Sequence, residues 1–372
     1  MSARPPSKIL RKDPIAQPSG ADSKAAPIRV MLVDDSLTVR TVFKRMIDRE
    51  PDLTITATAG TAEQALMSLR SQIADVILLD LEMPGMGGLE ALPKLLERSN
   101  NAQILVVSSL TDHGAEATLT ALSMGAADTM LKPRPGGFDD EYRDALLEKV
   151  RALGGQEGKS TAAPKKTPLK AVSKAASKRP EVVAIGASTG GIHALNLFLR
   201  ALPAEFDLPI LITQHLPDSF VPVFARQIEM AAGRETVLAD EDVAVQPNRI
   251  IIAPGNGHMN LRKSGTQVVT SLSYEAVTSG CMPSVDPMFK SCVQAFDGRV
   301  AAVLLSGMGR DGTAGANMVA EAGGIVLAQD EESCAVWGMP RTVSEEGTAI
   351  VTAPPEKLAA HLEKYAAVPA WQ

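Results

Sequence analysis

Residues 74–98 read ADVILLDLEMPGMGGLEALPKLLER, and this stretch decides the fold. It opens with a continuous apolar run that ends at Asp80, a pattern typical of a strand buried on both faces. After a glycine-rich turn, residues 88–98 place apolar side chains at helical spacing. The stretch therefore predicts a β-strand followed by an α-helix.

The same strand-then-helix order repeats on both sides of this stretch. It starts with IRVMLVDD at 28–35 and resumes, further along the chain, with EVVAIGAS at 181–188. Buried strands that alternate with helices imply a parallel sheet with helices on both faces. We therefore predict an α/β protein with two doubly wound parallel-sheet domains, at residues 28–153 and 181–372.

Two segments outside these domains differ in composition. Residues 1–27 contain five prolines and no aromatic residue, and residues 154–180 carry seven basic side chains and one acidic side chain. Neither segment has enough apolar surface to offset the conformational entropy that folding removes. We expect a disordered N-terminal tail at 1–27 and a flexible basic linker at 154–180, with a basic surface helix as the alternative for the linker.

The formal charge of −6 conceals an uneven distribution. The tail carries +3 and the linker +6, which leaves −15 on the two predicted domains. An acidic body repels phosphate backbones, which argues against nucleic acid as a partner. No apolar run reaches the about 18 residues of a membrane span, and the N-terminus lacks the apolar region of a secretory signal. The three cysteines form no CxxC pair, and so small and odd a number fits a reducing compartment. From these observations together we expect a cytoplasmic protein without membrane insertion.

Polar side chains end four strands of the first predicted sheet. Asp34 and Asp35 end the first strand, Asp80 the third, Ser108 the fourth and Lys132 the fifth. Since ligands of such sheets bind at the carboxyl ends of the strands, these groups are expected to share one crevice. Close carboxylates repel one another unless a cation joins them, and their oxygens suit Mg²⁺.

Asp80 is central in that crevice and is suited to attack a phosphoryl group as a carboxylate nucleophile. Mg²⁺ would neutralise phosphoryl oxygens, the Lys132 ammonium would add a point charge, and the Ser108 hydroxyl would donate a hydrogen bond. Unrelated polar strand ends are the alternative. The motifs DD, LLDLEMPGMGG, SS and KP each stand on the matching strand, and this favours phosphorylation of Asp80.

In their order and spacing these motifs resemble the receiver domain of two-component response regulators, which has a flavodoxin-like fold. The resemblance implies that Asp80 accepts the phosphoryl group and that Ser108 and Lys132 contact it. It also implies a Mg²⁺ site formed by Asp34, Asp35, Asp80 and the backbone carbonyl of Glu82. One position departs from the pattern, because many receivers carry an aromatic residue where this chain has Thr129.

Residues 186–190, GASTG, fit the pattern G-x-S-x-G between a predicted strand and a predicted helix. Such a turn exposes Ser188 at a helix N-terminus, where backbone N–H groups stabilise an oxyanion. A dinucleotide-binding motif needs glycine at position 188, and a P-loop needs lysine after Gly191, so neither fits. A glycine turn with a purely structural role is the alternative.

A serine hydroxyl needs a general base to become a nucleophile. His215 is the best candidate, because it ends the apolar strand LPILITQH at the same sheet edge as Ser188. We interpret the other four histidines as structural or solvated, namely His113, His193, His258 and His361.

An acid must orient the imidazole, and Asp311 is the candidate. It lies in the glycine-rich loop LLSGMGRDGTAG after another predicted strand. Asp330 is the alternative acid, and Ser306 is the alternative nucleophile. The order serine, histidine, aspartate differs from that of α/β-hydrolases, which indicates an independent fold with the same chemistry.

Further motifs follow the receiver-like part in a fixed order, namely AIGASTGG, ITQHLPDSF, IIIAPGNGHM, PSVDPMF, LLSGMGRDGTAG and AQDEESCAVWGMPR. They resemble the chemotaxis protein-glutamate methylesterases, whose catalytic domain is Rossmann-like. The resemblance implies a phosphorylation-activated serine hydrolase that removes methyl esters from glutamates on chemoreceptor cytoplasmic helices and deamidates specific glutamines. It implies a chemotaxis histidine kinase as phosphodonor, Mg²⁺ for phosphorylation and no cofactor for ester hydrolysis.

The same resemblance implies roles for single residues. Ser188 is then the nucleophile, His215 the general base and acid, and Asp311 the orienting carboxylate. Thr189 and the backbone N–H of Met308 belong to the oxyanion and catalytic pocket. The receiver domain packs over this site until phosphorylation relieves the block.

Two positions near the site depart from this family's pattern. Cys281-Met282 stand where many members have His-Arg or Tyr-Arg, and Ile192-His193 replace a common Pro-Glu. We expect these changes to affect substrate choice more than the reaction.

Two other classes of protein are alternatives. In the first, the receiver is joined to a domain that only binds partners, and the strand-end positions of Ser188, His215 and Asp311 argue against it. In the second, the protein is a DNA-binding response regulator. No compact basic helix-turn-helix pattern follows the linker, which argues against that class.

Overall fold

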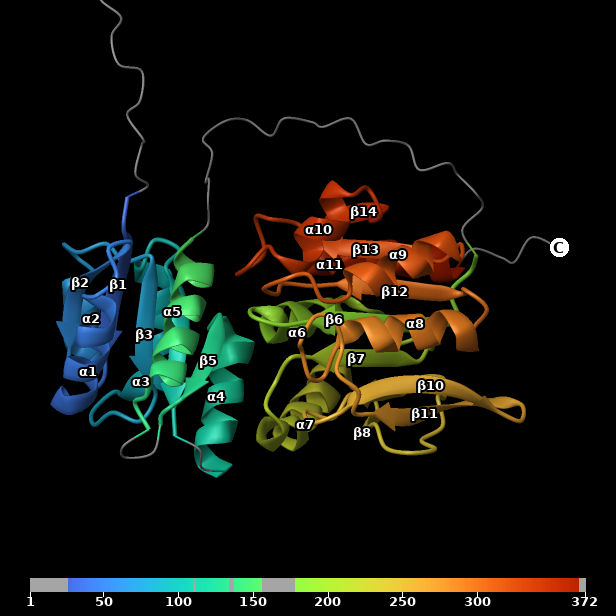
Figure 1. Cartoon of the computed structure of the whole chain (residues 1–372), viewed down its shortest axis with the longest axis horizontal. Helices are drawn as coiled ribbons and strands as arrows, with labels where there is room; N and C mark the ends of the chain where they lie inside the picture. The colour runs from blue at the N-terminus through green and yellow to red at the C-terminus, as the bar shows by residue number, and fades with distance from the viewer. Residues whose placement is uncertain (1–25, 110–111, 134–136, 156–177, 368–372) are drawn as a thin grey trace, which may run out of the picture.

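The computed structural model describes residues 26–109, 112–133, 137–155 and 178–367 (Figure 1). We call residues 26–155 the N-terminal unit and residues 178–367 the C-terminal unit. The tail expected at 1–27 and the linker expected at 154–180 lie almost entirely outside the described residues.

The N-terminal unit contains a five-stranded parallel sheet in the order β2-β1-β3-β4-β5. Its strands are β1 (Ile28–Val33), β2 (Leu53–Ala59), β3 (Val76–Asp80), β4 (Gln103–Ser108) and β5 (Asp128–Leu131). Its helices are α1 (Leu37–Ile47), α2 (Ala62–Ser68), α3 (Gly87–Arg98), α4 (Asp112–Met124) and α5 (Asp140–Gly154). Strands and helices alternate along the chain as the sequence predicted.

Alternate side chains of the strands build two apolar layers, one on each face of this sheet. On β1, Val30 and Leu32 belong to the layer with α1 and α5, whereas Met31 and Val33 belong to the layer with α2, α3 and α4. All four side chains are buried. Because helices cover both faces, the carboxyl edge of the sheet is the part that a ligand can reach.

The C-terminal unit contains a seven-stranded sheet in the order β14-β13-β12-β6-β7-β9-β8, and every pair in it is parallel. Its strands are β6 (Val182–Ala187), β7 (Ile210–Gln214), β8 (Thr236–Leu238), β9 (Ile250–Ile252), β12 (Val300–Leu304), β13 (Ile325–Gln329) and β14 (Val351–Ala353). Helices α6 (Gly191–Ala201), α7 (Val221–Ala232) and α11 (Pro355–Ala367) cover one face, and α8 (Val285–Ala295), α9 (Thr313–Glu321) and α10 (Met339–Glu345) the other. The predicted α/β class with parallel sheets is confirmed.

An antiparallel hairpin adds to this plan, and the sequence analysis did not anticipate it. β10 (His258–Ser264) pairs with β11 (Gln267–Ser273) around Gly265, whose φ of +61° suits glycine. Met259 and Leu261 of the hairpin pack in one apolar cluster with α8. The hairpin thereby carries His258 to the edge of the C-terminal sheet where the candidate active site lies.

The two units pack against each other through α4, which lies against α6 and α7 (Figure 1). Buried side chains of α4 and α6, including Leu119, Leu195 and Phe198, belong to one hydrophobic cluster. Across the described residues, no helix is both long and apolar enough to cross a bilayer.

Candidate functional site

Ser188 stands between β6 and α6 in a turn that only glycine permits. A Cβ at Gly186 would lie 2.5 Å from a methyl carbon of Val285. Gly190 has a φ of +78°, and a Cβ there would lie 2.5 Å from the Ser306 hydroxyl. Close packing and positive φ therefore fix the turn on both sides of Ser188.

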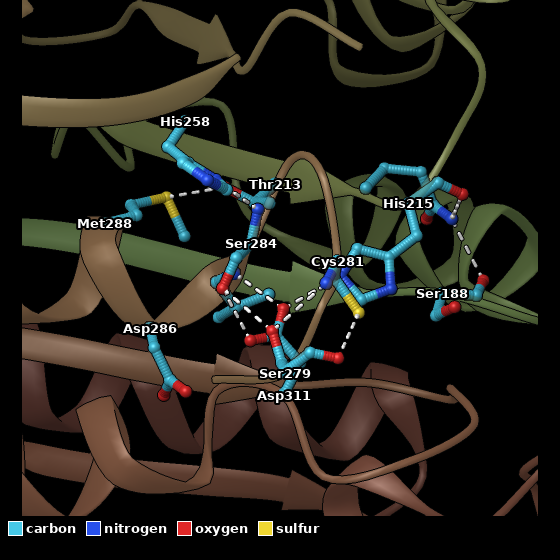
Figure 2. Close-up of polar contacts among 12 residues, drawn as sticks. Ser188, Thr213, His215, His258, Ser279, Cys281, Ser284, Asp286, Met288 and Asp311 are labelled. Atoms are coloured by element: carbon cyan, nitrogen blue, oxygen red, sulfur yellow. Dashed lines mark hydrogen bonds and ion pairs between the residues drawn. The ribbon is translucent and has the colours of Figure 1, made fainter. Parts of the chain in front are cut away.

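His215 directly follows β7, the neighbour of β6 in the sheet. Ala187 pairs with Gln214 across the two strands, so Ser188 and His215 each stand one residue beyond a paired position. The His215 backbone N–H donates to the Ala187 carbonyl at 3.0 Å, and the Gln214 side chain donates to the Ser188 carbonyl at 2.9 Å. Sheet register therefore brings these two residues together at one edge (Figure 2).

Asp311 reaches the same place from the loop that follows β12. Its Oδ2 lies 2.8 Å from His215 Nε2 and also accepts the Val285 backbone N–H at 2.7 Å. Its Oδ1 accepts the Ser284 hydroxyl at 2.7 Å. Burial alone would raise the pKa of this carboxyl, but the hydrogen bonds outweigh burial and hold the pKa below its usual value. Asp311 is therefore a buried, ionised acceptor.

The imidazole of His215 has a raised pKa. Burial disfavours the charged ring, yet hydrogen bonds to Asp311 and Cys281 outweigh burial and raise the pKa of His215 from 6.5 to about 9. In the neutral ring, which becomes the main form only above this pKa, Nε2 donates to Asp311 and Nδ1 is the nitrogen that can accept a proton from another group. Within the described residues no hydrogen bond joins the Ser188 hydroxyl to this ring, and such bonds often tighten only when substrate binds.

Cys281 is a neighbour of the imidazole that sequence reasoning missed. Its sulfur and donor atoms of His215 and Asp311 all lie within 4.8 Å of one another (Figure 2). Cys281 belongs to the loop between β11 and α8, where its backbone N–H donates to the Ser279 hydroxyl at 3.3 Å. The sequence had marked this position only as a departure from a family pattern, with no sign of a contact to His215.

His258 and Ser284 are buried residues that support Asp311 of the candidate triad through hydrogen bonds. The buried His258 ring accepts the Ser284 backbone N–H on Nδ1 at 3.0 Å and donates from Nε2 to the Glu275 carbonyl at 2.9 Å. Ser284 in turn donates its hydroxyl to Asp311. His258 therefore fixes the segment that satisfies the carboxylate, which agrees with its interpretation as a structural histidine.

The two alternative residues lie apart from the imidazole. The Ser306 hydroxyl is buried and donates to the Thr189 carbonyl at 2.7 Å, while Asp330 accepts hydrogen bonds from Ser333 in its own turn. In the part of the chain that the structure describes, neither residue has a hydrogen bond to His215. The geometry therefore favours Ser188 and Asp311 over them.

Thr189 and Met308, expected at the oxyanion pocket, both contact the N-terminal unit through their side chains. The Thr189 hydroxyl donates to Asp128 of β5 at 2.7 Å, and the same Asp128 oxygen accepts from Lys149 of α5 at 2.5 Å. The Met308 side chain packs against the apolar layer of α1 and α5 and lines a crevice there with Leu147.

The same contact zone extends along the turn and α6. The Gly190 backbone N–H donates to the Ala127 carbonyl at 2.6 Å, and His193 Nδ1 donates to the Ser123 carbonyl at 2.9 Å. The N-terminal unit therefore binds the residues on the carboxyl side of Ser188. The His193 departure lies in this interface, a role that its sequence context did not reveal.

The predicted acidic crevice forms at the carboxyl edge of the N-terminal sheet. Oxygen atoms of Asp34, Asp35 and Asp80 lie within 4.8 Å of one another. Lys132 Nζ lies 2.6 Å from Asp80 Oδ2 and 3.3 Å from Asp34 Oδ2. Burial raises the pKa of Asp80 in spite of this ammonium, so the site favours an added positive charge beside the carboxylate.

Two polar atoms in this crevice are buried with little to satisfy them: the Ser108 hydroxyl has no hydrogen-bond partner, and Asp34 Oδ2 has only the Lys132 ammonium at 3.3 Å among the described residues. Buried polar groups normally have hydrogen-bond partners or ligands, so these atoms fit a site completed by a cation and an anionic group. Glu82 donates its backbone N–H to Asp80 at 3.0 Å and turns its side chain to Ser109. Thr129 is buried on β5, and its hydroxyl also has no partner.

Comparisons with known proteins agree with this division of the chain. The family model described as CheB methylesterase matches residues 183–362, and the response regulator receiver domain model matches residues 30–137. A Rhodospirillum rubrum protein named protein-glutamate methylesterase/protein-glutamine glutaminase 1 is 38% identical, over 90% of this chain and 94% of that protein. A Caulobacter vibrioides protein named protein-glutamate methylesterase/protein-glutamine glutaminase 2 is 40% identical, over 90% of this chain and 98% of that protein.

A solved structure, the methylesterase catalytic domain of Thermotoga maritima CheB, is also similar. It has 34% sequence identity and a TM-score of 0.47, and the match covers 50% of this chain and 98% of that domain.

The contacts of His215 predict a measurable titration. In the full chain, NMR of the labelled imidazole should give a midpoint near pH 9, because Asp311 and Cys281 both favour the charged ring. Cys281→Ala removes one of these contributions, so the midpoint should fall. Cys334→Ala, which removes a buried thiol elsewhere, is the control. A midpoint unchanged by Cys281→Ala would contradict the contact.

Proposed function

The chain belongs to the family of protein-glutamate methylesterases/protein-glutamine glutaminases, and from this premise we propose that it is a phosphorylation-activated serine hydrolase of chemotaxis adaptation. Its substrates are γ-glutamyl methyl esters, and specific glutamines, on the cytoplasmic helices of chemoreceptors. The arrangement of Ser188, His215 and Asp311 at one sheet edge carries the proposal.

In the proposed reaction Ser188 attacks the ester carbonyl while Nδ1 of the neutral His215 ring takes the hydroxyl proton, so the rate should rise with pH up to the pKa of this ring near 9. The ionised Asp311 holds the ring through Nε2 and stabilises the imidazolium that forms. His215 then protonates the leaving methanol, and water hydrolyses the acyl-enzyme by the same route to give glutamate. A glutamine follows the same steps and releases ammonia. Neither reaction needs a cofactor.

The oxyanion of the tetrahedral intermediate needs hydrogen-bond donors close to Ser188. Among the described residues, the backbone N–H groups of Thr189 and Met308 donate to no protein acceptor. The N–H groups that follow Thr189 are occupied, since Gly190 donates to Ala127 and Gly191 donates to Ser188, and before Met308 the N–H of Gly307 donates to Val336. Two free donors beside the nucleophile support the oxyanion role, and such a donor contributes on the order of 3 kcal/mol.

We propose that the acidic crevice is the phosphorylation site. Asp80 accepts a phosphoryl group from a chemotaxis histidine kinase. Asp34, Asp35, Asp80 and the Glu82 carbonyl would hold Mg²⁺, which would supply positive charge against the phosphoryl oxygens. Lys132 and the partnerless Ser108 hydroxyl contact the phosphoryl oxygens.

β5 offers a short path from this crevice to the nucleophile. Lys132 directly follows the strand, whereas Asp128 begins it and accepts the Thr189 hydroxyl. We propose that the N-terminal unit blocks the site through Asp128 and the Met308 contact. Phosphorylation of Asp80 draws Lys132 and Ser108 toward the new anion, shifts β5 and weakens these contacts.

The remaining assignments follow from these roles. We propose residues 28–153 as the receiver domain, 154–180 as the linker and 181–372 as the catalytic domain. The acidic surface fits protein partners rather than nucleic acid. We propose the cytoplasm as the location, because receptor helices and the kinase are found there.

Methanol release from methylated chemoreceptor membranes, with a small phosphodonor and Mg²⁺, tests the esterase. Wild type should release methanol, and Ser188→Ala should reduce release by at least about a thousandfold, because no acyl-enzyme forms. Ser264→Ala, at an exposed serine of β10, is the matched control and should retain wild-type release. Near-normal release by Ser188→Ala would refute the triad assignment, whereas no release by either protein on several receptors would favour a domain that only binds partners.

The interface contact predicts a change in regulation. Asp128→Ala removes the acceptor of the Thr189 hydroxyl and should raise methanol release without phosphodonor by at least about fivefold. The additional stimulation by a phosphodonor should shrink by the same factor. Asp48→Ala, which removes an exposed carboxylate at the C-cap of α1 that pairs with Lys44, is the control. Equal basal rates for wild type and Asp128→Ala would contradict the proposed block.

A further inference from the structure

One group of side chains near Ser188 has donors that the proposed reaction does not use. The Cys281 sulfur, a ring nitrogen of His215 and a carboxylate oxygen of Asp311 lie within 4.8 Å of one another (Figure 2). Together they offer one sulfur, one nitrogen and one oxygen. This mixture of donors is typical of zinc sites and differs from the three carboxylates of the phosphorylation crevice.

The three donors come from separate parts of the C-terminal unit, and each is held in place. Asp311 is 2% exposed and anchored by Ser284 and Val285. His215 is fixed by the backbone hydrogen bond that follows β7. The Cys281 loop is held through Ser279 and remains partly exposed, so an ion has a route to the group. The three donors are therefore held close together before any ligand arrives, which lowers the cost of binding.

We propose that Cys281, His215 and Asp311 form a Zn²⁺ site, and that bound Zn²⁺ inhibits the proposed esterase. Zinc binds thiolate sulfur at about 2.3 Å and imidazole nitrogen or carboxylate oxygen at about 2.0–2.2 Å, so tetrahedral ligands lie about 3.3–3.6 Å apart. His215 Nε2 and Asp311 Oδ2 are now 2.8 Å apart and share a proton. An ion in place of that proton requires the two atoms to separate by roughly half an ångström.

Inhibition follows from the proton balance of the site. Binding removes the thiol proton of Cys281 and leaves Nε2 of His215 without a proton, so both protons pass to solvent when the ring starts charged. The neutral, metal-bound ring keeps its one proton on Nδ1. Nδ1 is the nitrogen that accepts the Ser188 proton in the proposed reaction, and it is then blocked. This consequence rests on the proposed function, whereas the metal site itself does not.

The metal site can be tested without any activity. Because Zn²⁺ is d¹⁰ and has no ligand-field spectrum, Co²⁺ serves as the probe, and a bound thiolate adds a sulfur-to-cobalt charge-transfer band. Full-length Ser188→Ala protein is titrated with Co²⁺ while excess Mg²⁺ occupies the carboxylate crevice. The charge-transfer band should appear and should disappear when Zn²⁺ is added.

Variants of single ligands sharpen this test. The band should be absent when Cys281→Ala is combined with Ser188→Ala, and should persist with Cys334→Ala as the thiol control. Competition with a chelator should show Zn²⁺ affinity at least about tenfold weaker in Cys281→Ser. Absence of the band in the Ser188→Ala protein, or its persistence after loss of Cys281, would overturn the proposed site.

Methanol release then tests inhibition, with each protein compared with its own metal-free rate. Zn²⁺ should reduce release by wild type at least about tenfold, and a chelator should restore it. Cys281→Ala should keep most of its own rate at the same Zn²⁺ concentration. Equal inhibition of both proteins would refute inhibition through this site. No methanol release by metal-free wild type would refute the proposed function, while the cobalt spectrum would still decide the metal site.

Discussion

The arrangement of the candidate active site depends on the hydrogen bonds to the buried carboxylate of Asp311. An ion held at 2% exposure is tolerated only when every oxygen is hydrogen-bonded, and removal of one partner of such a buried pair costs about 3–5 kcal/mol. Here the partners come from three places, the end of β7, the residue before α8 and the first residue of α8. The Asp311 carboxylate thereby links the end of β7, in the middle of the sheet, to α8, which covers one face of that sheet. It also fixes the orientation of the imidazole beside Ser188.

The fold follows from the sequence almost completely, because its signals are local. Continuous apolar strands such as residues 76–79, between helices with an apolar stripe, allow hardly any arrangement except parallel sheets covered on both faces. The chain direction of such sheets then places Asp34, Asp80 and Ser188 at strand ends. The hairpin of β10 and β11 was missed, because it pairs antiparallel outside the two sheets and its strands are half exposed.

The sequence predicts a residue of the candidate site only where that residue lies at, or soon after, the end of a predicted strand. Ser188 and His215 directly follow strands and Asp311 lies in the loop after β12, and the structure brings all three to one edge. Cys281 and Ser284 lie in the segment between β11 and α8, whose path is set by packing on the hairpin and not by any local pattern. The interface roles of Thr189 and His193 were equally hidden, because a contact between two domains leaves no periodicity in either. Such positions become visible only when the units are placed side by side.

The placement of Thr189 and Met308 explains why catalysis and regulation share the same few residues. The backbone N–H of each has no protein acceptor among the described residues, and each turns its side chain to the N-terminal unit. The backbone of these two residues therefore serves the proposed oxyanion, while their side chains serve the proposed block. A movement of β5 that releases Thr189 and Met308 acts on the oxyanion donors themselves and needs no longer path through the C-terminal core. Because the close-packed Gly190 follows Thr189 and the close-packed Gly307 precedes Met308, such a movement changes the direction of these two N–H groups more than it changes the surrounding fold.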